Sequence, residues 1–255
     1  MTESPVLAHG RAAKRRSRRS EPAQQTPLYR AICIGMLPLA ALVIGLSWTM
    51  MRAGIDSYRA ERFLQSWEAK GMPDAETLAA GRQAAEHAIE RFPAPNGEYL
   101  DRLGRVLSWE NADAPYGAAE AQASRQAALE TYRASLAVRP GWPWTWLRLT
   151  STKLSQQAFD DEFADALSRS SALGANRIEM DRDLARIGFE GWPSLTTEQR
   201  VLTLKAAART VGYSYPEAQN LYGLAQRAGL NVPLCWSLSE DIRAKRQICK
   251  KEGSS

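Results

Sequence analysis

The chain has 255 residues, of which 24% are charged, and its net charge is +5. The first 30 residues hold seven Lys and Arg against two Glu, so they account for the whole net charge and the rest of the chain is neutral. A neutral bulk, with no aromatic residue among positions 1–28 on which a base could stack, excludes binding of nucleic acid through a basic domain. The Ser, Pro, Gln and Arg of the tail predict a disordered segment over 1–30.

The next element is an uncharged run, AICIGMLPLAALVIGLSWTMM, over residues 31–51. As a helix with a rise of about 1.5 Å per residue, this run is roughly 31 Å long, which matches the hydrocarbon core of a bilayer. It ends in Trp48, Thr49, Met50 and Met51, where a cleavable signal peptide would have small residues. The sequence therefore predicts a single, uncleaved transmembrane helix.

The charge asymmetry around this run predicts the topology. Basic residues beside a membrane span are retained in the cytoplasm. We therefore expect residues 1–30 in the cytoplasm, where their arginines contact membrane lipid, and residues 52–255 on the other side.

From Arg52 onward the composition is typical of helices, because Ala, Leu, Arg, Gln and Glu dominate and strand-like runs are absent. Three capping boxes are predicted: Thr196 with Gln199, Ser214 with Glu217, and Ser237 with Glu240. The expected helices are 53–70, 75–91, 97–109, 117–139, 143–157, 161–173, 177–189, 196–211, 216–228 and 238–249. The fold class is therefore all-α, a transmembrane helix followed by a soluble domain of helical hairpins.

The middle of the chain carries the residue pattern of a degenerate tetratricopeptide repeat. The small, aromatic, small and proline positions of its second helix are Ala128, Tyr132, Ser135 and Pro140. Pro93, at the end of an earlier unit, lies 47 residues before Pro140, whereas the repeat has 34 residues. An insertion such as 110–123 must therefore loop out or lengthen a helix.

The most unusual segment is PGWPWTWLRL at 140–149, which has three tryptophans within five residues. Aromatic faces bind sugar rings, and an arginine binds an acidic group, so Trp142, Trp144 and Arg148 are the candidate binding surface. Residues at i, i+2 and i+4 do not share one helical face. We expect Trp146 to pack between helices, and Trp192 to anchor a turn.

Motifs for catalysis, cofactors and metals are absent from the sequence. The two histidines, His9 and His87, are isolated, and no phosphate-binding loop, nucleophile elbow or zinc pattern occurs. Asp160, Asp161 and Asp165 could do acid–base work on a glycoside, but Asp160 also fits the N-cap of a helix. The sequence predicts no enzyme, no cofactor and no metal.

Cys235 and Cys249 are the only cysteines outside the apolar run, and an oxidising compartment favours joining them. An unbroken helix over 237–249 would instead separate their Cα atoms by roughly 18 Å, beyond the reach of a disulfide. The expectation is that the helix persists and that no intrachain bond forms.

Four runs within about residues 55–200 share the pattern of one protein family: FLQSWEAKGMPDAETL, PNGEYLDRLGRVLSW, ASLAVRPGWPWTWLRLTSTKLSQQAFDDEFADALSRSSALG and RIGFEGWPSLT. These runs resemble the VpsP-like polysaccharide biosynthesis proteins, single-span proteins encoded with bacterial exopolysaccharide synthesis genes. The resemblance implies a bacterial inner-membrane protein with its helical domain in the periplasm. It supplies no catalytic or ligand residues.

Three functional hypotheses follow. The first is a membrane-anchored accessory or scaffold protein of exopolysaccharide synthesis and export, which binds the machinery proteins of the inner membrane and also glycan. The second is a general periplasmic tetratricopeptide-like adaptor of envelope assembly. The third is a glycan-acting enzyme that uses Asp160, Asp161 and Asp165.

Overall fold

The computed structural model describes residues 27–249. Within that range the chain forms eleven α-helices, two short 3-10 helices and no strand, which confirms the all-α class. The chain divides into two compact units, residues 1–45 and residues 46–255. The predicted disorder of the basic tail lies, up to residue 26, outside the described residues.

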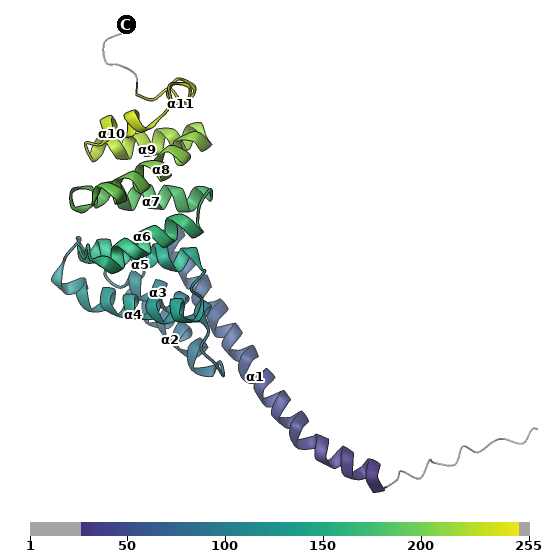
Figure 1. Cartoon of the computed structure of the whole chain (residues 1–255). Coiled ribbons are helices and arrows are strands. Elements are labelled where there is room, and N and C mark those ends of the chain that lie inside the picture. The colour runs from purple at the N-terminus through teal and green to yellow at the C-terminus, as the bar shows by residue number, and fades with distance from the viewer. Residues whose placement is uncertain (1–26, 250–255) are drawn as a thin grey trace, which may run out of the picture. The chain divides into compact units, whose positions relative to one another are not determined.

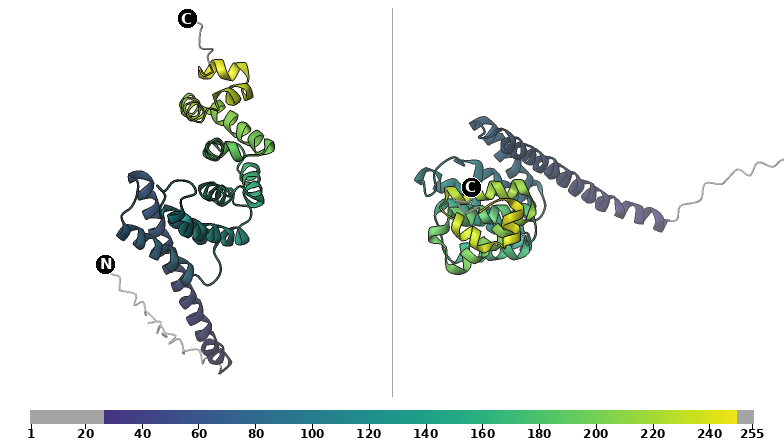
Figure 2. Two further views of the ribbon diagram at one scale, coloured as in Figure 1. Left: turned by 90° about the vertical axis from the view of Figure 1, so that its left-hand side faces the viewer. Right: turned by 90° about the horizontal axis from the view of Figure 1, so that it is seen from above.

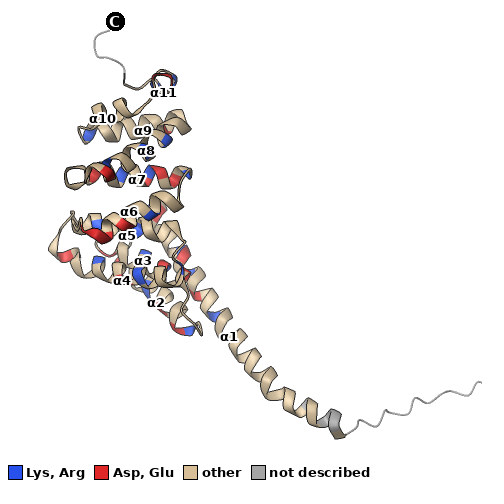
Figure 3. Cartoon of the chain, in the orientation of Figure 1, with Lys and Arg blue, Asp and Glu red and all other residues tan. Residues whose placement is uncertain are grey.

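Helix α1 (Pro27–Lys70) is unbroken over 44 residues, where the sequence predicted a membrane span followed by a separate helix from residue 53. No proline or capping residue separates the two segments at Arg52, so the helix continues through it. Figure 3 shows the change along α1, from a stretch without charged side chains to one that carries both signs. Of the described helices, α1 alone is long and apolar enough to cross a membrane.

The C-terminal part of α1 belongs to the second unit and presents one face to its core. The buried positions of this face follow helical spacing: Ala53, Asp56, Ser57, Ala60, Leu64 and Trp67. Its polar members have partners on later helices, because Asp56 pairs with Arg91 and Ser57 accepts a hydrogen bond from Arg102. This face holds the helix against the rest of the unit.

Ten shorter helices complete the second unit, and most of them lie within two residues of their predicted bounds. They are α2 (Ala75–Arg91), α3 (Gly97–Trp109), α4 (Gln122–Val138), α5 (Pro143–Gln156), α6 (Asp161–Leu173), α7 (Ile178–Glu190), α8 (Thr197–Tyr213), α9 (Tyr215–Arg227), α10 (Asn231–Ser237) and α11 (Glu240–Arg246). The 3-10 helices are η1 (Ala119–Ala121), before α4, and η2 (Trp192–Ser194), between α7 and α8.

Successive helices from α2 to α9 pack side by side along a stack, and α10 and α11 pack on α8 and α9 at its end (Figures 1 and 2). The core is correspondingly divided into four apolar clusters along the stack. The first joins α1, α2 and α3, the second α3 to α6, the third α5 to α8, and the last α7 to α11. Each helix therefore buries its apolar face mainly against neighbours in sequence.

The insertion predicted at 110–123 loops out. The chain leaves α3 at Glu110 and returns through η1, so α4 begins at Gln122 and not at the predicted residue 117. Asn111 and Gly117 in this loop adopt the left-handed conformation, which a continuing helix does not allow. The inserted residues therefore form a separate loop beside α4 and α5.

Of the three capping boxes predicted from the sequence, one forms completely and one forms in part. Thr196 and Gln199 form the reciprocal box, and the Ser214 hydroxyl accepts the Glu217 amide at 3.3 Å. Glu217 does not reach back, because its carboxylate binds Arg182 at 2.9 Å.

The prediction of a C-terminal helix over 238–249 without a disulfide was wrong. Ser237 ends α10, and Ser239 caps α11 by accepting the amide of Ile242. The chain turns between the two short helices, which brings the Cα atoms of Cys235 and Cys249 to 5.7 Å, and the two cysteines form a disulfide. Leu234, Leu238 and Ile248 are buried in the last cluster, so apolar burial at the end of the stack favours the turn over a straight helix.

We expect the double variant Cys235→Ser/Cys249→Ser to lose about 3 kcal/mol of unfolding free energy, because the bond closes a loop of about 15 residues. Urea unfolding of the full chain in detergent measures this change. Dithiothreitol should lower the unfolding free energy of the wild-type protein to that of the variant, and it should leave the unfolding free energy of the variant unchanged. An oxidised protein with the same mass as its reduced form, instead of one lighter by two hydrogen atoms, would contradict the bond.

Candidate functional site

Trp142 is the exposed member of the tryptophan-rich segment. It immediately precedes α5, and 38% of its surface is accessible. The guanidinium carbon of Arg139 lies 4.2 Å from the centre of its ring, within cation–π distance. Trp142 therefore offers one aromatic face that is already partly covered by an arginine.

The other two indoles pack into different parts of the core. Trp144 is half-buried against the α5–α8 cluster, whereas Trp146 is half-buried against the α3–α6 cluster. The Trp146 indole also donates a hydrogen bond to the carbonyl of Pro140 at 2.8 Å. The three tryptophans therefore do not form one continuous aromatic surface, as their spacing on the helix predicts.

Trp192 lies in η2 between α7 and α8, as predicted for a turn anchor. It is half-buried against two of the apolar clusters, and its ring lies 6.4 Å from that of Phe189.

Arg148 is held by a buried carboxylate that the sequence analysis missed. Its guanidinium donates to Asp101 on α3 at 2.6 Å, and the Thr145 hydroxyl donates to the same carboxylate at 2.7 Å. The sequence did contain a signal that Asp101 is buried. This residue lies on the same helical face as Gly97 and Gly104, where α3 approaches α4. Only the packing of α3 against α5 shows which arginine neutralises it.

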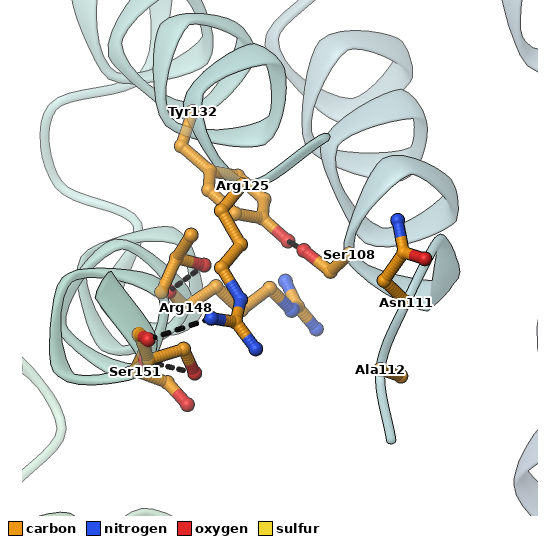
Figure 4. Close-up of a pocket in the computed structure, with 9 residues that line it drawn as sticks. Ser108, Asn111, Ala112, Arg125, Tyr132, Arg148 and Ser151 are labelled. Atoms are coloured by element: carbon orange, nitrogen blue, oxygen red, sulfur yellow. Dashed lines mark hydrogen bonds between the residues drawn. The ribbon is translucent and has the colours of Figure 1, made fainter. Parts of the chain in front are cut away.

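Arg148 also lines a pocket of about 180 Å³ where α3, α4, α5 and the 110–118 loop meet (Figure 4). The lining residues are Ser108, Asn111, Ala112, Arg125, Tyr132, Arg148, Ser151, Thr152 and Ser155. Most of them are polar, two are arginines and none is a carboxylate. The pocket is therefore polar and positively charged.

Arg125 is the second arginine of the pocket, and sequence analysis did not single it out. It is only 6% exposed, and its guanidinium donates to the carbonyls of Ala114, Pro115 and Ser155 at 2.7 to 3.1 Å. These bonds tie the 110–118 loop to the last turn of α5. In the sequence, the length of the inserted loop was the signal for this site. Only the folded loop determines which carbonyls Arg125 contacts.

Tyr132 closes the inner end of the pocket. Its hydroxyl lies 3.0 Å from that of Ser108, and burial raises the pKa of its phenol. The phenol is therefore protonated at neutral pH and can donate or accept a hydrogen bond. No histidine lies in the pocket, so it contains no residue suited to act as a general base near neutral pH.

The acidic cluster lies at the start of α6 and has structural partners. Asp160 caps α6 by accepting the amide of Phe163 at 3.0 Å, and it accepts a hydrogen bond from Lys153 at 2.8 Å. Glu162 binds Lys153 at 2.6 Å and Arg133 at 2.6 and 2.7 Å. Lys153 is buried, so the two carboxylates together neutralise a cation inside the protein.

The pKa values of these carboxyl groups show which protonation state the cluster favours. Hydrogen bonding to Arg133 lowers the pKa of Glu162 to about 2. Partial burial opposes ionisation of Asp160, but hydrogen bonds from Lys153 and from the Phe163 amide outweigh it and lower its pKa. Both groups are therefore ionised at neutral pH and are poor general acids.

The remaining acidic candidates are exposed. Asp165 pairs with Arg169 one turn later at 2.8 Å, and Asp161 lies in the first turn of α6. Among residues 27–249, no three His, Cys, Asp or Glu side chains are placed to hold a metal ion. His87 lies half-buried on α2, and His9 is outside the described residues.

Comparisons with models of known protein families, with curated proteins and with solved structures find no match for this chain.

We expect Asp160→Asn/Glu162→Gln to lose about 3 kcal/mol or more of unfolding free energy, because Lys153 remains buried without a counterion. Asp165→Asn is the matched control, and its exposed pair predicts a loss below about 0.5 kcal/mol. Urea unfolding followed by tryptophan fluorescence measures both.

The same cluster predicts a pH dependence. The depressed pKa of Glu162 stabilises the fold above its ordinary value of 4.5, and this contribution is lost as the pH falls toward about 2. Glu162→Gln should therefore flatten the stability profile between these pH values. Equal acid sensitivity of the variant and the wild-type protein would contradict the role of Glu162.

Proposed function

We propose that this protein is a membrane-anchored accessory or scaffold protein of bacterial exopolysaccharide synthesis and export. The observation that carries the proposal is the continuity of α1, whose apolar part has the length of a membrane span and whose C-terminal part is built into the helical unit. An unbroken helix tethers the binding unit directly to the membrane, where polymer synthesis and export take place. The partners are the machinery proteins of the inner membrane.

The proposed topology places the helical unit in the periplasm. Two independent features support it: the basic residues before the apolar segment, and the Cys235–Cys249 disulfide, which persists in an oxidising compartment.

The proposed mode of action is binding, with no chemistry on the polymer. Stacked helix pairs, here in a degenerate tetratricopeptide-like arrangement, offer extended surfaces for partner proteins. Of the three carboxylates that would serve a glycosidase, Asp160 is bound to Lys153 and Asp165 is paired with Arg169 on the surface. We assign the scaffold to exopolysaccharide because the chain resembles the VpsP-like proteins. For the same reason we propose glycan as a second ligand.

The second candidate is a general periplasmic tetratricopeptide-like adaptor of envelope assembly. The same anchor and the same stacked helices favour it, since neither feature depends on polysaccharide. The third, a glycan-acting enzyme, would use Asp160, Asp161 and Asp165, of which Asp160 is bound to Lys153 and Asp165 to Arg169.

Reporter fusions test the topology. Alkaline phosphatase fused after Ser255 should be active, whereas a green fluorescent protein that does not fold in the periplasm should stay dark at the same junction. The opposite pair of signals would place the helical unit in the cytoplasm and overturn the proposal.

Deletion of the gene tests the function. We expect the strain to grow normally but to secrete less polymer or shorter chains, and the wild-type gene should restore both. The variant Asp161→Asn/Asp165→Asn should also restore the polymer, because neither carboxylate supports the fold. Unchanged polymer would favour the general adaptor, and failure of this variant alone would favour the enzyme.

A further inference from the structure

We propose that the pocket between α3, α4, α5 and the 110–118 loop binds a small oxyanion, the carboxylate of an acidic sugar or a phosphate group. The proposal goes beyond the scaffold function, because it concerns a defined ligand site and does not depend on which assembly the protein serves. It rests on the charge, the size and the donor groups of the pocket.

The charge of the pocket is incompletely neutralised. Among the described residues no carboxylate lies within ion-pair distance of Arg125, although this residue is nearly fully buried. Its three carbonyl partners include Ser155 in the last turn of α5, and a helix C-terminus supplies about half a negative charge. Arg148 has the Asp101 carboxylate, so two guanidiniums share one acid and one helix end.

An uncompensated buried cation is costly, and a bound anion removes that cost. An oxyanion in the pocket would take bidentate hydrogen bonds, the geometry that guanidinium groups favour.

The donors of the pocket face the same space. A guanidinium has five N–H groups; Arg125 uses three hydrogen bonds for the loop and for α5, and Arg148 uses one for Asp101. Figure 4 shows both guanidiniums and Ser151 around the pocket. Ser151 and Asn111 add further polar groups at its wall.

The size of the pocket limits the ligand. Its volume of about 180 Å³ is below the roughly 300–1,000 Å³ of pockets for drug-sized molecules. A phosphate ion or the carboxylate end of one sugar residue fits this limit, whereas a polymer segment could insert only its charged group. The outer wall comes from the inserted loop, the kind of segment that commonly carries binding residues.

Titration calorimetry of the full chain in neutral detergent, at constant ionic strength, tests the proposal. The probes are inorganic phosphate and glucuronate, with glucose as the uncharged counterpart of the sugar acid. We expect saturable binding of at least one anion and none of glucose, and the anion that binds identifies the source of the charge. Absence of saturable binding by both anions would overturn the proposal.

A substitution that places a carboxylate in the pocket gives a second test. Ser151→Asp should raise the thermal midpoint above that of the matched variant Ser151→Asn and weaken anion binding at least tenfold. An acid near the C-terminus of α5 is otherwise unfavourable, so a gain in stability points to the guanidiniums. A midpoint no higher than that of Ser151→Asn, or anion binding that survives Ser151→Asp, would overturn the assignment of an anion site to this pocket.

Discussion

The continuity of α1 is the constraint on which the rest of the structure depends. One helix must be apolar all round over 31–51 and then present a narrow buried face from Ala53 to Trp67. Because the helix does not break at Arg52, the first apolar cluster forms on the helix that carries the membrane-spanning length. The later helices then follow this cluster in chain order, so the apolar segment and the helical unit share one continuous backbone.

Stacking in chain order gives the unit two ends, and an end exposes an apolar face that no further helix covers. At the C-terminal end, α10 and α11 are too short to be stable alone, and they fold back on α8 and α9. The Cys235–Cys249 disulfide restricts the unfolded chain in this region and compensates for the small number of packed neighbours.

Buried cations occur where helices meet, and their charges are compensated in two different ways. Lys153 has two carboxylates from the start of α6, and this network fixes α5 against α6. Arg125 instead has three backbone carbonyls, which take three of its five N–H groups and do not neutralise its charge. This difference separates a purely structural ion cluster from a pocket that attracts an anion.

The sequence by itself determined the helix class, the apolar segment and most helix bounds, because periodicity and capping are local properties of the chain. The Asp160 cap follows from the same local signals, whereas the repeat spacing left open whether 110–123 loops out or lengthens a helix. Tertiary structure alone decided the C-terminal turn, since burial of Leu234, Leu238 and Ile248 outweighs helix continuation. It also brought Asp101, Arg125 and Arg148 together from three helices, and the pairing of residues so distant in sequence depends on how the helices pack.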